Sequence, residues 1–372
     1  MNACQYLNKE SLLLVFVLVF LSSVYTGCSS TPPSSAELDL DGNWQLHYLE
    51  GTKITVLEPD EEGLFVGTEA GLFQLQGTEL VPLGLEEHEI VGVVRLKNGE
   101  LLASVREWVF GSGNPTLYRT ENNEETWEPF MKNFGGEEGK YTQIGSGPYA
   151  VQPGSDTLFV TGFWLIRSED AGINWSIHTE GGDGITVVET WNAFGLSRLL
   201  YVDPHHNGRI WIGGMNTLSR AYLLKYTDFG EDWEDVSDGL SPNTEARAQA
   251  LFTHPDHPDW VMVGLSGAIV QANNVKKSTD GGQSWRTSLE KTGVRAFARS
   301  LQHPNVIYAG GRISSGKLYF AATVDFGETW QKEIFEEGPY PITTNDLAVQ
   351  VIDGQEVLFL GTDRGLYSFE LN

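Results

Sequence analysis

The sequence of 372 residues is poor in cysteine and in positive charge. It contains two cysteines, Cys4 and Cys28, and 24 lysines and arginines against 50 aspartates and glutamates, a formal net charge of -26. Nucleic acids and anionic membrane surfaces are bound through cationic patches. The charge balance therefore argues against both classes of partner, and an acidic surface mainly favours solubility.

Long apolar runs are scarce as well. The run LLLVFVLVFL, from Leu12 to Leu21, follows Lys9 and precedes small residues, which is typical of a secretory signal peptide and short for a membrane span. The segment then reads YTGC, which resembles the lipobox of bacterial lipoproteins, although Tyr25 replaces the usual Leu. The resemblance implies a signal peptide over residues 1–28 and a lipid on Cys28. The alternative is an ordinary signal peptide with an incidental cysteine.

Processing that makes Cys28 the new N-terminus would remove Cys4 and leave Cys28 as the single cysteine, so no internal disulfide is expected. Residues 29–40 are rich in Ser and Pro and predict a flexible tether. What remains is rich in Gly (42) and Trp (11), a composition that suits an all-β protein with many turns.

A short motif recurs along this part of the chain: SEDAGINW, YTDFGEDW, STDGGQSW and TVDFGETW. Five tryptophans at the motif position lie 45–58 residues apart, which suits one four-stranded propeller blade per repeat. We count seven units, whose innermost strand, strand A, begins near Thr55, Val91, Pro148, Leu199, Ala248, Ala296 and Leu347.

The seventh unit ends after its third strand, and the N-terminal end supplies the missing one. Residues 41–51, DGNWQLHYLEG, read as the end of a motif followed by a strand that starts at Trp44. Pairing this strand with the last three would remove an exposed sheet edge. The sequence thus predicts an all-β, seven-bladed β-propeller over residues 41–372, closed by an N-terminal strand that completes the last blade.

The motif residues suit a structural role. The Asp can accept backbone N–H groups two or three residues on, the Gly tolerates φ > 0, and the Trp can pack between blades. One carboxylate per motif falls short of the six to eight oxygens that calcium takes, so neither a metal nor a cofactor is predicted. The predicted structural residues are Asp170, Trp175, Asp228, Trp233, Asp280, Trp285, Asp325 and Trp330.

The pattern Ser/Thr-x-Asp-x-Gly-x-x-Trp resembles the Asp-box, or bacterial neuraminidase (BNR) repeat, a WD40/YVTN/BNR-like repeat. Residues 168–175, 278–285 and 323–330 match it, Tyr226 replaces the hydroxyl residue in a fourth copy, and the copy at 120–127 is decayed. The resemblance implies the fold of sialidase-like and photosystem II assembly-factor-like propellers. No Arg-Ile-Pro of sialidases occurs, so sialidase activity is not expected.

Propeller ligands usually bind over the central channel, on the face that carries the B–C and D–A loops. Several arginines fall at such positions, and Trp108 lies in a long B–C loop. A cationic channel mouth on an acidic body would bind an acidic group. The predicted ligand-binding residues are Arg106, Trp108, Arg247, Arg295, Arg312 and Arg364, with Arg198, Arg220 and Arg299 at related positions. The alternative is that they pair with carboxylates such as Glu107, Glu245 and Asp363.

Five histidines fall in the A–B turns: His205, His206, His254, His257 and His303. We interpret them as turn residues, because a zinc site needs three or four converging ligands.

Two functional hypotheses follow. The first is an exported, lipid-anchored, monomeric binding or assembly module of the cell envelope. It takes a protein or acidic glycan at the channel mouth and meets the membrane through its lipid alone. The alternative is a glycoside hydrolase or lyase that acts on polysaccharide. An enzyme of that kind needs two carboxylates about 5–9 Å apart, and Glu107 with Glu189 or Asp346 are the candidates.

Overall fold

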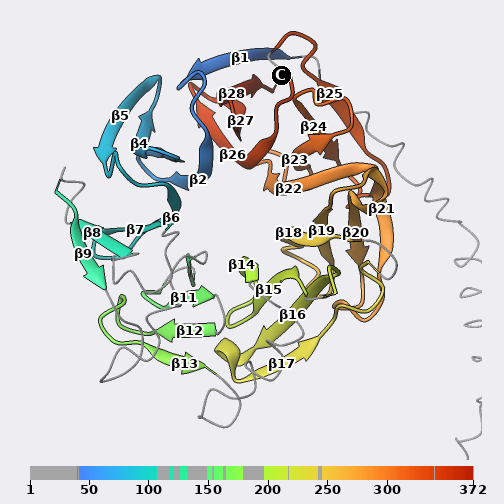
Figure 1. Ribbon diagram of the computed structural model, residues 1–372, viewed down its shortest axis with the longest axis horizontal. Helices are drawn as coiled ribbons and strands as arrows, with labels where there is room; N and C mark the ends of the chain where they lie inside the picture. Colours follow the sequence, from blue (N-terminus) through green and yellow to red (C-terminus); the bar gives the residue numbers. More distant parts are fainter. Residues whose placement is uncertain are drawn as a thin grey trace, which may run out of the picture. The chain divides into compact units, whose positions relative to one another are not determined.

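Seven four-stranded sheets stand as blades around a central axis and form a β-propeller, as Figure 1 shows. The computed structural model describes residues 40, 42–106, 117–120, 126–131, 149–152, 155–161, 165–178, 197–216, 218–241, 245–338 and 340–371. Residues 1–37 form a unit separate from residues 38–372, and every described strand lies in the second unit. Cys28, the signal peptide, almost all of the tether and Trp108 lie outside the described residues.

Each blade runs outward from the centre in the strand order A, B, C, D, with antiparallel neighbours. Blade 1 consists of β2 (Ile54–Asp60), β3 (Gly63–Thr68), β4 (Gly71–Gln76) and β5 (Glu79–Gly84). Blade 2 consists of β6 (Ile90–Arg95), β7 (Leu101–Val105), β8 (Leu117–Thr120) and β9 (Glu128–Met131). Blade 3 consists of β10 (Tyr149–Val151), β11 (Leu158–Thr161), β12 (Leu165–Ser168) and β13 (Ser176–His178).

Short 3-10 helices interrupt the next two blades. Blade 4 consists of β14 (Ser197–Val202), β15 (Ile210–Met215), β16 (Ala221–Thr227), η1 (Asp228–Gly230) and β17 (Asp232–Asp235). Blade 5 consists of β18 (Arg247–Thr253), β19 (Val261–Ser266), η2 (Val270–Ala272), β20 (Asn274–Ser278) and β21 (Arg286–Glu290). Blade 6 consists of β22 (Thr292–Arg299), β23 (Ile307–Ile313), β24 (Tyr319–Thr323) and β25 (Gln331–Ile334).

Both ends of the described chain meet in blade 7. It contains β26 (Thr344–Ile352), β27 (Gln355–Thr362) and β28 (Gly365–Glu370), and β1 (Asn43–Tyr48) pairs with β28 as its outermost strand. In Figure 1 the blue β1 lies beside the red C-terminal strands. The predicted seven-bladed fold and its N-terminal closing strand are therefore confirmed.

Burial falls from the centre of each blade to its rim, and this gradient explains the sequence pattern. The B strand β27 is buried at every residue after the first, since neighbouring blades cover both of its faces. The D strand β21 has a single buried residue. Sheets covered on both faces read as continuous apolar runs, whereas rim strands keep polar residues.

Glycines within the B strands allow neighbouring blades to approach. A Cβ on Gly361 of blade 7 would lie 2.7 Å from Ile54 Cγ2 of blade 1, and a Cβ on Gly310 of blade 6 would lie 3.1 Å from Leu347 of blade 7. Any larger residue would push the inner strands apart, because interiors are packed to near-crystalline density.

The repeated motif forms the C–D turn through a fixed set of hydrogen bonds. In blade 5, Ser278 Oγ donates to Asp280 Oδ1 at 2.7 Å and accepts the Gly282 N–H at 2.8 Å. Asp280 also accepts the Ser284 N–H at 2.9 Å, four residues on, and Asp325 of blade 6 accepts N–H groups three and four residues on, where two or three were expected. Hydrogen bonds from the Ser284 and Ser278 side chains lower the pKa of Asp280 to about 2.

Blade 4 shows what the hydroxyl residue does. Tyr226 replaces it and is buried, and no side-chain bond to Asp228 is found among the described residues. The turn tightens into η1, in which Asp228 and Phe229 take φ values of 47° and 59°. A Ser or Thr hydroxyl at this position therefore keeps the C–D turn in the wider conformation of blade 5.

Most motif tryptophans bond to the preceding blade. Trp285 Nε1 donates to the carbonyl of Val236 in blade 4 at 2.8 Å, and Trp330 Nε1 donates to Ser288 Oγ in blade 5 at 2.9 Å. Trp44 of β1 donates to Glu333 in blade 6 at 3.2 Å and packs against Phe369. Trp175 instead donates within its own turn, to the carbonyl of Gly172.

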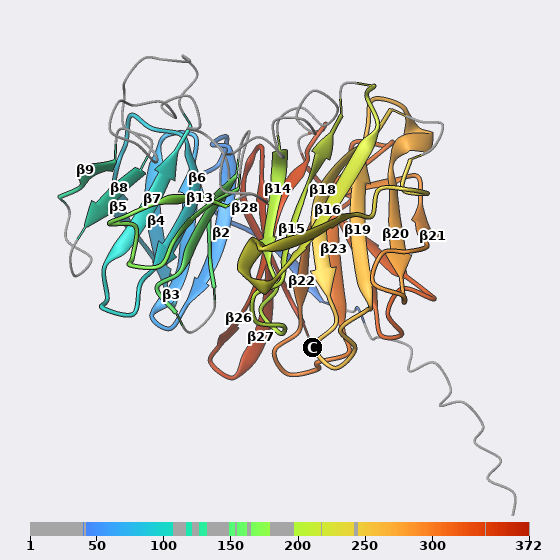
Figure 2. The same ribbon diagram turned by 90° about the horizontal axis from the view of Figure 1, so that it is seen from below.

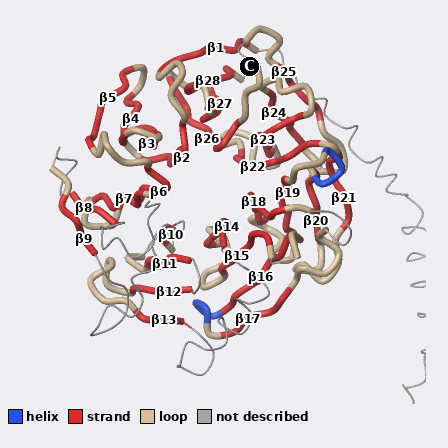
Figure 3. The backbone as a smooth tube through the Cα atoms, viewed as in Figure 1, coloured by secondary structure: helices blue, strands red, loops and turns tan. Residues whose placement is uncertain are grey.

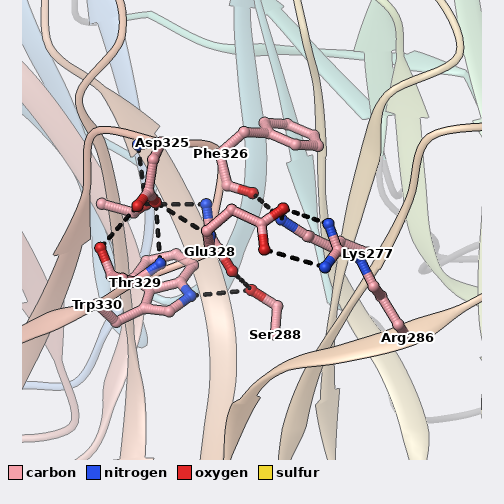
Figure 4. Close-up of polar contacts among 10 residues, drawn as sticks. Lys277, Arg286, Ser288, Asp325, Phe326, Glu328, Thr329 and Trp330 are labelled. Carbon is pink, nitrogen blue, oxygen red and sulfur yellow. Dashed lines mark hydrogen bonds and ion pairs between the residues drawn. The ribbon is translucent and has the colours of Figure 1, made fainter. Parts of the chain in front are cut away.

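A cation placed just before one motif holds the turn of the next blade. Lys277 of β20 is only 2% exposed, and its Nζ donates to the Phe326 carbonyl at 2.8 Å and to Glu328 at 2.7 Å, both in the blade 6 motif (Figure 4). Arg286 also pairs with Glu328. Arg167, at the same repeat position in blade 3, donates to the carbonyl of Phe229 in blade 4 at 3.3 Å.

Replacing Lys277 should therefore loosen the contact between blades 5 and 6. We expect Lys277→Met to lower the free energy of unfolding by about 2 kcal/mol, because a buried carbonyl loses a charged donor. Lys276→Met, on the same strand, removes a bond to Thr287 near the surface and should cost less than about 0.5 kcal/mol. Urea unfolding of both variants measures the difference, and equal losses would contradict the role of Lys277.

Candidate functional site

The innermost strands enclose two adjoining cavities along the central axis, each of about 840 Å³. One is lined mainly by β2, β14, β18, β22 and β26, and the other by β2, β6, β10 and β14. Glu58, Asp60, Glu61 and Tyr201 line both. Figure 3 shows these strands surrounding the centre of the ring. We call the two cavities together the channel.

The strands run between two faces of the ring, which Figure 2 shows from the side. The B–C and D–A connections lie at one face, here the D–A face, and the A–B and C–D connections lie at the other, here the A–B face. Each A strand therefore starts at the D–A face and ends at the A–B face. This direction decides where each predicted site residue lies.

Six of the seven A strands carry a β-bulge close to the D–A face, where one residue has no partner in the B strand. Bulges re-aim side chains and are common beside functional sites. The bulged residues are Thr55, Val91, Arg198, Gln249, Arg295 and Asn345.

The bulge residues of blades 6 and 7 form a polar chain that reaches the backbone of blade 1 beside its own bulge. Arg295 donates to Asn345 Oδ1 at 3.0 Å, and Asn345 Nδ2 donates to the carbonyl of Ile54 at 2.9 Å. A polar residue at this point of strand A is visible in the sequence, as Gln249 between Ala248 and Ala250, or Arg295 between Val294 and Ala296. Sequence reasoning singled out Arg295 but missed Gln249 and Asn345.

Arg295 lies among other arginines with little compensating charge. Burial lowers the pKa of Arg295, and the nearby charges of Arg312 and Arg247 lower it further, against the opposing effect of Asp363. Its Nε is buried and has no acceptor among the described residues. The hydroxyl of Tyr319, a fully buried residue close enough to interact electrostatically with Arg295, likewise has no partner there.

The predicted arginines divide into two groups. Arg247, Arg295 and Arg312 lie together in blades 5 and 6, and Arg364 lies in the B–C turn of the adjoining blade 7. Arg106 of blade 2 instead pairs with Glu89 at 2.7 Å. We call Arg247, Arg295, Arg312 and Arg364 the arginine mouth.

The alternative of local pairing holds for Arg106, although its partner is Glu89 and not Glu107. In the described part of the chain, no ion pair joins Arg295, Arg312 or Arg364 to a carboxylate, and Asp363 instead accepts the Thr343 N–H at 2.8 Å. Arg299 was wrongly expected near the mouth. It is the last residue of β22, so strand direction carries it to the A–B face.

Carboxyl groups occupy the channel beyond the bulges. Asp346 uses one oxygen to accept the Leu57 N–H of blade 1 at 2.8 Å and the other to accept the Leu347 N–H at 2.9 Å. Burial raises the pKa of Asp346 to about 6, against those two bonds. The Glu58 side chain is exposed to the channel. Desolvation by the surrounding protein, and then the charges of Asp346 and Asp60, raise the pKa of Glu58 to about 8.

The histidines of the A–B turns form two clusters. Buried Asp203 accepts two backbone N–H groups and the His206 ring at 3.0 Å, while His257 stacks on Trp260 with ring centres 4.2 Å apart. Burial, and then Arg299, lower the pKa of His205. Within the described residues, no group of three or more His, Cys, Asp or Glu could hold a metal ion.

The fold is shared with solved structures at low sequence identity. YCF48 from Cyanidioschyzon merolae matches with a TM-score of 0.60 and 12% identity, over 88% of this chain and 98% of that one, and a structure of YCF48 bound to a D1 peptide matches similarly, with a TM-score of 0.60 and 15% identity. A GH74 xyloglucanase from Xanthomonas campestris matches with a TM-score of 0.63 and 17% identity, over 88% of this chain and 53% of the enzyme.

A third likeness is to the extracellular domain of a hybrid two-component system of B. thetaiotaomicron, with a TM-score of 0.60 and 14% identity. This chain covers 39% of that domain's length. No family model and no curated protein matches the sequence. Among the helices that the structure describes, none is long and apolar enough to span a membrane.

The raised pKa of Glu58 makes stability depend on pH. A carboxyl whose pKa is higher in the folded state contributes stability that is complete below its unfolded pKa of about 4.5 and is lost as pH rises through about 8. Gln mimics the protonated form, so Glu58→Gln should raise the Tm at pH 9 and leave it unchanged at pH 4.5. Water in the channel screens the charge of Glu58, so we expect a rise of only about 2 °C.

Thermal unfolding at both pH values measures the effect. Glu79→Gln is the matched control, since it removes the same charge from the exposed outer strand of the same blade. A Tm difference that is independent of pH, or that appears equally in the control, would contradict the raised pKa.

Proposed function

We propose that this propeller is a non-catalytic binding or assembly module that holds an acidic group of a protein or glycan at the arginine mouth. The observation that carries the proposal is the environment of Arg295. The half-buried side chain of Arg295 has two arginines nearby and a buried Nε without an acceptor among the described residues, an arrangement that an anion would stabilise. A carboxylate or phosphate supplies both the charge and the acceptors that are missing.

Exposure within the mouth fits the same role. The side chains of Arg312 and Arg364 are exposed, whereas those of Arg247 and Arg295 are half-buried. An entering anion would meet mobile, hydrated arginines first and a pre-oriented one last. Arg recognises carboxylate with two parallel bonds, so the deeper position can set orientation as well as affinity.

We favour a binding module over a glycoside hydrolase or lyase because of how Asp346 is used, the one of the three candidate carboxylates that the structure describes. Glu107 and Glu189 lie outside the described residues. One oxygen of Asp346 accepts the Leu57 N–H of blade 1, and the other accepts the N–H of Leu347 on its own strand. A catalytic base needs a free lone pair aimed at substrate or water. Asp346 is thus better suited to holding two blades together than to acid–base chemistry.

The D1 peptide seen on YCF48 and the extracellular location of the two-component domain accord with a binding role outside the cytoplasm, at identities that speak only for the fold. We include in the proposal export through residues 1–28, a lipid on Cys28, and a tether of residues 29–40. The anchor would then hold the propeller at a membrane of the cell envelope as a monomer.

The arginine mouth can be tested with peptides that carry a free C-terminal carboxylate, their C-terminal amides, and an array of acidic glycans. Arg247→Gln combined with Arg295→Gln should weaken binding of the preferred anionic probe by about 10- to 100-fold, because each charged hydrogen bond contributes about 1.5–3 kcal/mol. Lys276→Gln, on strand β20 of blade 5, removes a positive charge from outside the channel and should leave binding unchanged.

Thermal unfolding of the same variants separates binding from folding. If the double variant loses stability and binds the anionic probes like wild type, the arginines serve the fold and the proposal is wrong. Equal binding of carboxylate and amide peptides, with no acidic glycan bound, would also overturn it.

A further inference from the structure

The Glu58 side chain is exposed to the channel, lines both cavities and has no hydrogen-bond or ion-pair partner among the described residues. Two of the acidic residues around it, Asp60 and Asp346, are already engaged, whereas Glu61 lines the same cavities. Asp60 pairs with Arg95 at 2.8 Å, and Asp346 is held by two backbone N–H groups. The charges that most affect Glu58 are both negative, Asp346 and Asp60. A carboxylate in this setting gains from either a proton or a cation.

The number of free oxygens decides which cation fits. A calcium ion takes six to eight oxygens, whereas Glu58 and Glu61 supply at most four, and Asp60 and Asp346 are occupied. An ammonium or guanidinium group needs only one carboxylate with hydrogen-bonding geometry. The cavity volume of about 840 Å³ accommodates a side chain of that kind.

We propose that Glu58 binds the ammonium or guanidinium group of a ligand whose acidic group is held at the arginine mouth. The inference rests on the proposed function and narrows it, because the ligand becomes a zwitterionic peptide segment rather than a polyanionic glycan. Its carboxylate would lie near Arg295 and its Lys or Arg side chain farther along the channel.

Strand geometry gives the separation of the two groups. Arg295 and Thr55 both occupy the bulge level, and Glu58 lies three residues beyond Thr55 on β2. At about 3.3 Å per residue, the carboxylate and cation sites lie about 10 Å apart along the channel. A Lys or Arg within the last three or four residues before a C-terminal carboxylate can span that length.

Protonation of Glu58 should compete with the cation. Binding of a Lys peptide should therefore strengthen as pH rises through the range in which Glu58 loses its proton, and the carboxylate contact should not change over that range. The charged and titratable groups that face Glu58 are Asp60 and Glu61 of β2 and the loop after it, Arg95 and Lys97 of β6 and its turn, Tyr201 of β14, Arg295 and Arg299 of β22, and Asp346 of β26.

The test uses peptides with a free C-terminal carboxylate in which each of the four preceding positions carries Lys, Arg, Gln or norleucine. Wild-type protein should prefer Lys or Arg at one position by about 10-fold at pH 8.5, and less at pH 6. Glu58→Gln should abolish that preference and its pH dependence while it still requires the carboxylate. Glu79→Gln on the outer strand should bind like wild type.

The outcomes separate the two proposals. A carboxylate requirement without any Lys or Arg preference, or with a preference that survives Glu58→Gln, overturns the cation site and leaves the arginine mouth standing. A preference that depends on Glu58 without a carboxylate requirement supports the cation site and overturns the mouth. Loss of folding in Glu58→Gln is excluded by its Tm, which should equal or exceed that of wild type.

Discussion

Closure of the ring is the constraint on which the rest of the structure depends. A blade buries both faces only against its neighbours, so blade 7 must meet blade 1 or leave a wide apolar surface exposed. The outer part of that junction is β1, paired with β28. The inner part is polar, because Asn345, Asp346 and Gln350 of β26 all bond to the backbone of blade 1.

The same inner contacts shape the channel. The bulges allow Arg295 of blade 6 to bond to Asn345 of blade 7. They also place polar atoms in a part of the channel wall that is otherwise apolar. Asp346 shows the consequence for its neighbours: as it holds Leu57 in place, it fixes a negative charge near Glu58 and raises the pKa of that carboxyl. The groups that close the ring therefore set the electrostatics of the site.

Repetition made the fold predictable from the sequence, because a strand or turn that is unclear in one copy of the pattern is clear in other copies. The missing fourth strand of the last unit, with the motif ending of residues 41–51, was enough to place β1 in the last blade. The site was less accessible, for physical reasons. A polar residue at the bulge position is visible in the sequence, but the bulge itself depends on register between strands, so Gln249 and Asn345 were missed. Arg299 was misplaced because it lies at the end of its strand that is far from the mouth. The partner of Arg106 came from a neighbouring strand end rather than from the adjacent Glu107.

The acidity of the chain bears on which ligand the mouth can accept. With a net charge of -26, the protein has a negative electrostatic potential that repels polyanions at long range. At physiological ionic strength the Debye length is about 8 Å, so local arginines dominate only for groups that have already reached the mouth. A segment whose acidic group is balanced by its own cation meets little long-range repulsion, and it satisfies Arg295 and Glu58 together. Charge at long range and charge within the channel thus select for the same zwitterionic chemistry.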